Sequence, residues 1–93
     1  MPKLTSSRLR DLIRALDYVV SIHASEELDD DNLTILDLEN IILTGEIVER
    51  QRDRQTGEVK CVIRGLTLDD RKAESVVKVG PTGKPFVITV YLL

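Results

Sequence analysis

Alternating apolar and polar positions near the C-terminus form the clearest pattern in the chain. The apolar positions of this alternation are Phe86, Ile88, Val90 and Leu92, and the positions between them are Val87, Thr89 and Tyr91. Segment 76–79 is also rich in β-branched residues, and the turn formers Gly80-Pro81-Thr82-Gly83-Lys84 separate the two segments. The pattern predicts a β-hairpin that closes an antiparallel sheet.

A second pair of strands is predicted directly upstream. Segments 46–51 and 59–64 flank the turn Asp53-Arg54-Gln55-Thr56-Gly57, and Val59, Cys61 and Ile63 share one face of the returning strand. The chain therefore has four predicted strands in a meander. Their apolar side is expected to form one core with a helix, a core made of Leu38, Ile41, Phe86, Ile88 and Val90.

Helical spacing of apolar residues marks the N-terminal half. A first helix is predicted to begin at Thr5, Ser6 or Ser7 and to end near Asp17, with a stripe of Leu9, Leu12, Ile13 and Leu16. Segment 18–23 predicts a short strand or extended link, because β-branched residues dominate it. A short helix is expected from near His23, and the run Asp29-Asp30-Asp31-Asn32 is its end or a loop.

The best-marked helix begins after Thr34. Asp37 at the third helical position makes a capping box with Thr34, and Leu33 and Leu38 form the matching hydrophobic staple. Gly45 stands where a helix-ending glycine belongs. The order of helices first and strands afterwards predicts one α+β domain over residues 1–93, with two or three N-terminal helices packed on one face of a four-stranded antiparallel β-meander.

Composition is that of an ordinary globular chain, with 42% hydrophobic and 31% charged residues. The N-terminus has no apolar signal core and no apolar stretch approaches a membrane span, so we expect a cytoplasmic protein without membrane contact. Cys61 is the only cysteine and lies in an apolar run, which favours a small buried residue over a nucleophile.

Charge is distributed unevenly. Residues 15–49 contain ten acids and no Lys or Arg, whereas residues 50–93 contain nine basic residues and five acids. The acidic helical side is a candidate surface for a basic partner, formed by Glu26, Glu27, Asp29, Asp30 and Asp31. A calcium loop is excluded there, because the glycine and glutamate that such a loop requires at its sixth and twelfth positions are absent.

The predicted strand parity gives a second candidate surface. If the apolar face packs on the helices, the opposite face carries Val48, Val62, Val76 and Val87 together with Arg50, Lys60, Arg64, Lys78, Thr89 and Tyr91. Basic side chains beside a tyrosine can bind a phosphodiester and stack a base. The same residue types also occur on the solvent-facing side of any antiparallel sheet. The residue pattern leaves both interpretations open.

His23 is the only histidine and the only side chain expected to titrate near neutral pH. It is a candidate general acid or base, or a structural hydrogen-bonding residue. There is no second histidine or cysteine pair for zinc, and the glycine-rich nucleotide motifs and GxSxG are absent. We expect no metal and no small-molecule cofactor.

The order of several short segments resembles a bacterial domain-of-unknown-function family numbered 4258. These segments are Ser21-Ile22-His23-Ala24, Leu33-Thr34 with the capped helix to Leu43-Thr44-Gly45-Glu46-Ile47-Val48-Glu49, Ile63-Arg64-Gly65, and Phe86-Val87-Ile88-Thr89-Val90-Tyr91. That family is similar to the RelE-type toxins, small α+β proteins often encoded beside an antitoxin, some of which cut mRNA without a metal. The resemblance covers about residues 18–91.

This resemblance implies a toxin-type domain of a bacterial toxin–antitoxin-like system and, if it is active, a metal-independent endoribonuclease. His23-Ala24, Gly45 and Thr89-x-Tyr91 match the family pattern, but Glu27 and Asp31 stand where the family commonly has arginines. The implied catalytic residues are His23, Arg64, Lys78 and Tyr91, with RNA-binding residues Arg50, Lys60 and Thr89. RNA and an antitoxin-like protein are the implied partners. The alternative is a non-catalytic interaction module that uses its acidic helical side.

Overall fold

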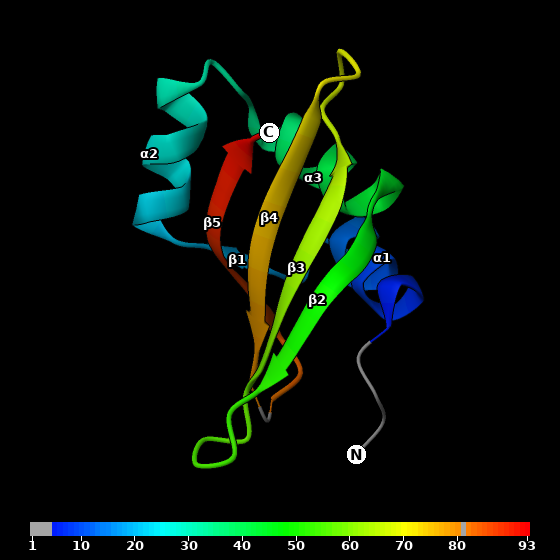
Figure 1. Ribbon diagram of the computed structural model, residues 1–93, viewed down its shortest axis with the longest axis vertical. Helices are drawn as coiled ribbons and strands as arrows, with labels where there is room; N and C mark the ends of the chain where they lie inside the picture. Colours follow the sequence, from blue (N-terminus) through cyan, green and yellow to red (C-terminus); the bar gives the residue numbers. More distant parts are fainter. Residues whose placement is uncertain (1–4, 81) are drawn as a thin grey trace.

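The computed structural model describes residues 5–80 and 82–93. Over these residues the chain forms three helices and one five-stranded mixed sheet, an α+β arrangement (Figure 1). Pro81 of the predicted turn and residues 1–4 lie outside the described residues.

The first helix, α1 (Ser6–Arg14), begins at Thr5, whose hydroxyl accepts a hydrogen bond from the Arg8 backbone N–H at 3.1 Å. It ends before Asp17, because Leu16 has left-handed backbone geometry with φ of 57°. The backbone N–H groups of Leu16 and Asp17 turn back to bond carbonyls of the last helical turn. The prediction that Leu16 extends the buried stripe is therefore wrong: Leu16 is 70% exposed.

The second helix, α2 (Ile22–Asp30), starts at the N-cap Ser21 and ends with the same C-terminal motif, in which Asn32 takes the left-handed position. The third helix, α3 (Ile35–Thr44), has the predicted capping box. The Thr34 hydroxyl accepts from the Asp37 backbone N–H at 3.3 Å, and the Asp37 carboxylate accepts from the Thr34 backbone N–H at 2.9 Å. This part of the sequence-based prediction is confirmed.

The strands are β1 (Val19–Val20), β2 (Glu46–Arg52), β3 (Val59–Leu66), β4 (Lys72–Val79) and β5 (Pro85–Leu92). Their order in the sheet is β1-β5-β4-β3-β2. Strands β2 to β5 pair antiparallel in chain order, and β1 adds a parallel strand beside β5. The predicted four-stranded antiparallel sheet is thus corrected to a mixed sheet of five strands within the described residues.

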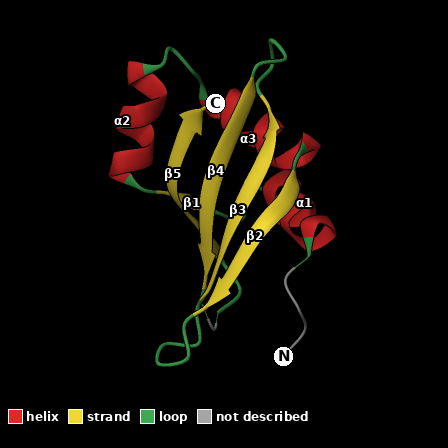
Figure 2. Cartoon of the chain, viewed as in Figure 1, coloured by secondary structure: helices red, strands yellow, loops and turns green. Residues whose placement is uncertain are grey.

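Helices cover only one side of the sheet. Helix α3 packs on β3 and β4, α1 packs on α3, and α2 lies beside β5 (Figures 1 and 2). The core between them is apolar and includes Leu9, Ile13, Leu38, Ile41, Ile63, Val77, Val87 and Val90. We call this side of the sheet the inner face and the opposite side the outer face. No helix in the described range is long and apolar enough to cross a membrane.

Two glycines allow α3 to approach the sheet. A β-carbon on Gly65 would lie 1.9 Å from the carbonyl oxygen of Ile41, and one on Gly45 would lie 2.4 Å from the same oxygen. Gly45 ends α3 as predicted, but its φ is −88°, so it does not take the left-handed conformation of a typical helix-ending glycine. Close packing explains the missing side chain at both positions.

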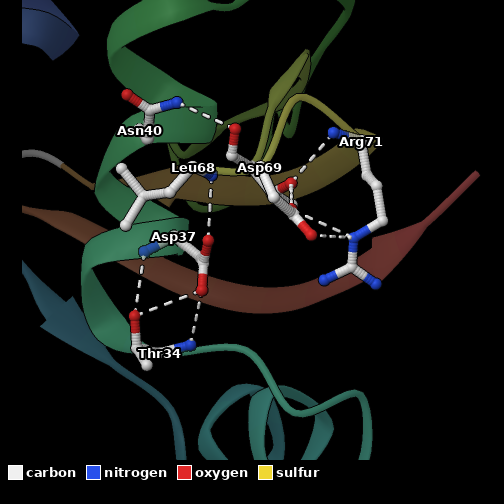
Figure 3. Close-up of polar contacts among 7 residues, drawn as sticks. Thr34, Asp37, Asn40, Leu68, Asp69 and Arg71 are labelled. Carbon is white, nitrogen blue, oxygen red and sulfur yellow. Dashed lines mark hydrogen bonds and ion pairs between the residues drawn. The ribbon is translucent and has the colours of Figure 1, made fainter.

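Side chains of α3 also bind the turn between β3 and β4 (Figure 3). One oxygen of the buried Asp37 carboxylate accepts from the Leu68 backbone N–H at 2.9 Å, and the Asn40 amide donates to the carbonyls of Leu66 and Thr67. The hydrogen bond from the Thr34 backbone is the largest influence that lowers the pKa of Asp37. The capping residue therefore joins the helix start to a distant turn.

Two β-bulges change the predicted strand parity. In β2, Val48 lies between Ile47 and Glu49, which pair with the consecutive residues Ile63 and Val62. In β5, Ile88 is the extra residue, because Val87 and Thr89 pair with the consecutive residues Val77 and Val76. Each extra residue reverses the face on which later side chains lie.

The bulges correct several predicted placements. Val87 is on the inner face and fully buried, whereas Phe86 is on the outer face and 38% exposed. Ile88 is only partly buried, so Phe86 and Ile88 do not join the core with Val90. Arg50 pairs with the buried Cys61 and therefore lies on the inner face, not beside Lys60 as predicted.

The register can be tested with Val87→Ala and Phe86→Ala. Val87→Ala should lower the free energy of unfolding by about 2–3 kcal/mol, because it removes buried methyl groups from a packed site. Phe86→Ala should cost only about 1 kcal/mol despite the larger deletion. Urea denaturation measures both values. The reverse order would show that Phe86, rather than Val87, belongs to the core.

The close approach of α3 predicts a contrast between two glycines. Gly65→Ala should destabilise the fold at or above the upper end of the roughly 1–3 kcal/mol that overpacking typically costs. Gly80→Ala is the matched control, because the nearest atom to a β-carbon there is 4.0 Å away. Thermal melting of both variants tests this. Equal melting temperatures would contradict the packing described above.

Candidate functional site

The outer face carries three rows of side chains that cross strands β3, β4 and β5. Direct cross-strand pairing defines each row. We name them the Arg64 row (Arg64, Glu74, Tyr91), the Val62 row (Val62, Val76, Thr89) and the Lys60 row (Lys60, Lys78, Phe86). Neighbouring rows are two residues apart along a strand, or about 7 Å.

The Arg64 row is a closed hydrogen-bond network around Glu74. The Nε and Nη2 atoms of Arg64 each lie 2.8 Å from the same carboxylate oxygen of Glu74, and Nε donates a hydrogen bond to it. The Tyr91 hydroxyl donates to the other carboxylate oxygen at 2.6 Å. Glu74 is only 7% exposed although it lies on an open face. The Arg64 side chain is 55% exposed, so its remaining N–H groups are accessible to an anion.

This network separates the pKa values of the two acids. The hydrogen bond from Tyr91 and the contacts with Arg64 lower the pKa of Glu74, against the effect of burial. The same hydrogen bond, together with burial, raises the pKa of Tyr91. Glu74 is therefore a carboxylate and Tyr91 a neutral donor at physiological pH.

At one end of the Val62 row, Glu27 of α2 contacts β5. A single Glu27 oxygen accepts two hydrogen bonds, one from the Thr89 hydroxyl and one from the Val90 backbone N–H at 3.1 Å. The Nε2 atom of His23 lies 3.3 Å from the same oxygen. His23 occupies the preceding turn of α2, four residues earlier, and its side chain is 68% exposed. Glu27 thus joins the histidine to the outer face.

Ser21 fixes where α2 begins relative to β5. Its hydroxyl caps the helix by accepting from the Ala24 backbone N–H at 3.0 Å, and it donates to the Ile88 carbonyl at 2.9 Å. Its own backbone N–H donates to the Val87 carbonyl. Ser21 and Glu27 therefore occupy backbone groups of β5 beyond the short β1 ladder, and they position His23 at the sheet border.

The Lys60 row lies toward the hairpin turns. Lys78 forms an ion pair with Glu58 at 3.1 Å, and its Nζ is 5.7 Å from the centre of the Phe86 ring. Lys60 is exposed, and no partner for its ammonium group is found among the described residues. This end of the outer face combines two cations with an aromatic ring.

The structure places the predicted catalytic and RNA-binding residues in three groups on or beside the outer face, with Arg50 apart from them. His23 and Thr89 meet through Glu27, and Arg64 and Tyr91 meet through Glu74. Lys60 and Lys78 form a separate group, and Arg50 lies on the inner face. Of the acids in the alternative surface, Glu26, Asp29 and Asp30 are exposed, Asp31 is partly exposed, and Glu27 is directed to β5.

Sequence reasoning missed Glu74. Lys72, Glu74, Val76 and Lys78 alternate along β4, and an acid among the cations of that face was the available signal. What the pattern did not reveal is that Glu74 holds Arg64 and Tyr91 together. Among the residues that the structure describes, no group of three or more His, Cys, Asp or Glu side chains is placed to hold a metal.

Comparison with protein families gives one match. The sequence model of the family described as Domain of unknown function (DUF4258) matches residues 20–92. The chain belongs to the DUF4258 family. In this DUF4258 chain the match begins at Val20 in β1 and includes α2, α3 and β2–β5, whereas α1 precedes it. Comparisons with curated proteins and with solved structures found no match.

The Glu74 network predicts a specific pH dependence of stability. Because the pKa of Glu74 is lowered in the folded state, its stabilisation is present above the unfolded pKa of a glutamate and is lost as pH falls through the folded pKa. Glu74→Gln should therefore flatten the acid side of the stability–pH curve. Urea denaturation of the wild type and Glu74→Gln between about pH 2 and 7, where carboxyl groups titrate, measures the free energy of unfolding of both proteins. If that free energy falls equally with acid in both proteins, the network is contradicted.

Proposed function

We propose that the outer face and the start of α2 form the RNA-binding site of a RelE-like, toxin-type domain. In this proposal His23 transfers the proton in metal-independent cleavage of RNA. The observation that carries it is the His23–Glu27 pair, which is anchored on Thr89 and the Val90 N–H at the border of an open face with cations and aromatic rings.

Glu27 gives His23 the arrangement of an oriented general base. If Nε2 carries a proton directed to Glu27, Nδ1 has the free lone pair and can accept a proton from a ribose 2′-hydroxyl. The carboxylate cannot swing freely, since the Thr89 hydroxyl and the Val90 N–H also bind it. His23 is exposed enough for a substrate to reach it.

Because Glu27 stands where the family pattern commonly has an arginine, we expect other residues to bind the phosphate groups of RNA. In the family pattern an arginine is common there, whereas in this chain Glu27 is bound by groups of β5 and His23. Phosphate binding then falls to Arg64, Lys60 and Lys78 on the sheet. Tyr91 can offer a ring next to Arg64, and its neutral hydroxyl stays a hydrogen-bond donor.

The RelE-like assignment and the toxin–antitoxin setting belong to the same proposal. Their support is the family membership together with the order of features, in which helices precede an antiparallel meander. A second candidate function is favoured by the exposed acids Glu26, Asp29 and Asp30 on α2. They suit a basic protein partner, such as an antitoxin-like protein, without any catalysis.

The proposal predicts that His23→Gln lowers the rate of RNA cleavage by about 10²–10⁴-fold, which is typical of a lost general acid or base. The fold should persist, because His23 is exposed. Glu26→Gln, on the same helix but outside the His23–Glu27 pair, is the control and should cleave like the wild type. The measurement is single-turnover cleavage of labelled RNA in the presence of a chelator.

Two outcomes would count against this function. Equal cleavage by the wild type and His23→Gln, at matched melting temperatures, would remove the histidine from catalysis. Background-level cleavage by the wild type would leave the interaction module. In that case replacing Glu26, Asp29 and Asp30 with Lys should abolish capture of a basic antitoxin-like protein.

A further inference from the structure

Among the residues that the structure describes, two adjoining hollows lie on the outer face beside the Lys60 and Val62 rows. The larger, of about 330 Å³, is bordered by Lys60, Lys78, Gln51, Arg52, Asp53 and Glu58. The smaller, of about 190 Å³, shares Gln51 and Lys60 with it and continues over Val62 and Val76. Together they run along β3 from its hairpin end toward Arg64.

The acids at the larger hollow are already engaged. Glu58 pairs with Lys78, and one Asp53 oxygen accepts hydrogen bonds from the backbone N–H groups of Gln55 and Thr56 in the turn. Lys60 lies on the outer face and has no partner among the described residues, whereas Arg52 pairs with Val59 and so belongs to the inner face of β2. The exposed ammonium group of Lys60 at this hollow is therefore available to a phosphate group.

Charge and ring are paired at both ends of this path. The Lys60 row has Lys60 and Lys78 with Phe86, and the Arg64 row has Arg64 with Tyr91. The Val62 row between them has an apolar pair, Val62 and Val76. The two charged rows are four residues apart along β3, which is about 13 Å.

We infer that the outer face binds a single-stranded nucleic acid along β3, with one phosphate at Lys60 and Lys78 and another at Arg64. Bases stack on Phe86 and Tyr91, and the apolar pair lies beneath the segment between them. At 3.4 Å per stacked nucleotide, the 13 Å path corresponds to about four steps. This inference rests on the proposed function for the kind of polymer and adds its path, contacts and length.

An acidic peptide is the competing ligand for exposed cations such as Lys60 and Arg64. The repeated combination of cation and ring favours nucleic acid, because a polynucleotide repeats one phosphate and one flat base in every unit. Glu49 borders the smaller hollow, where its carboxylate accepts from the Gln51 amide at 3.2 Å. It repels a phosphate, so its removal should strengthen binding.

Binding can be measured without cleavage by using 2′-O-methyl oligouridylates of one to eight nucleotides in fluorescence anisotropy. Affinity should rise with length and level off at about four to six nucleotides. With three cations engaged, log K should fall with log [salt] with a slope of roughly −2. A mononucleotide that binds as tightly as the hexamer would overturn the path.

Variants identify the contacts. Lys60→Gln and Arg64→Gln should each weaken hexamer binding several-fold and reduce the salt slope by about 0.7. Phe86→Leu should weaken binding by on the order of tenfold with an unchanged slope. Glu49→Gln should strengthen it, and Arg14→Gln on α1 is the charge-matched control. Equal affinities of wild type, Lys60→Gln and Phe86→Leu would overturn the inference.

A final comparison distinguishes a nucleic-acid ligand from an acidic peptide, and it tests this inference independently of the proposed function. A hexaglutamate peptide should displace the oligonucleotide poorly, and displacement at an equal charge concentration would overturn the choice of nucleic acid. Length-dependent binding without any RNA cleavage would leave the path intact and refute the ribonuclease. His23-dependent cleavage in proteins whose Lys60, Arg64 and Phe86 variants bind normally would refute the path alone.

Discussion

Two extra residues, Val48 in β2 and Ile88 in β5, decide which side chains share the outer face. Without the bulge in β5, Phe86 and Val90 would lie on the same face, and the strand could not present Thr89 and Tyr91 beside Glu74 while burying Val87. Without the bulge in β2, Arg50 would face outward. The three rows that form the candidate site therefore depend on the bulge in β5, and the bulge in β2 removes Arg50 from the face that carries them.

The border of the sheet at β5 serves the fold and the site with the same groups. An open strand edge presents unpaired backbone N–H and C=O groups, which proteins usually cover. Here Ser21 and Glu27 bind backbone groups of β5 after the two-residue β1 ends. The carboxylate that covers the edge also lies against His23, so the orientation of the histidine follows from closing the sheet.

Glu74 solves a related problem on the outer face. A nearly buried carboxylate is unfavourable unless charged or polar groups compensate it, and Arg64 and Tyr91 supply that compensation from the neighbouring strands. The network in turn restricts the Arg64 guanidinium and the Tyr91 ring to one arrangement. A flexible arginine on an exposed strand would lose more conformational freedom on binding a phosphate than one held in this way.

Local signals determined much of this protein. The Thr34–Asp37 capping box, the helical stripe of α3 and the glycine-containing turns act within a few residues, so the sequence alone predicted α3 and the four strands that follow it. His23 was singled out as the only histidine, and Arg64, Lys78 and Tyr91 became candidates through strand parity and the family resemblance. Nothing local marked Glu74, because its role depends on partners ten and seventeen residues away.

Only the tertiary structure decided the faces. A bulge has no reliable local signature, and one extra residue exchanges the two sides of a strand, so alternation misplaced Phe86, Val87 and Arg50. The sequence predicted a short strand or extended link over residues 18–23, but the parallel pairing of β1 with β5 was decided by the tertiary structure. The sequence also could not show that the Glu27 side chain contacts β5. Its partners Thr89 and Val90 lie more than sixty residues away in the chain and come close to it only in the folded protein.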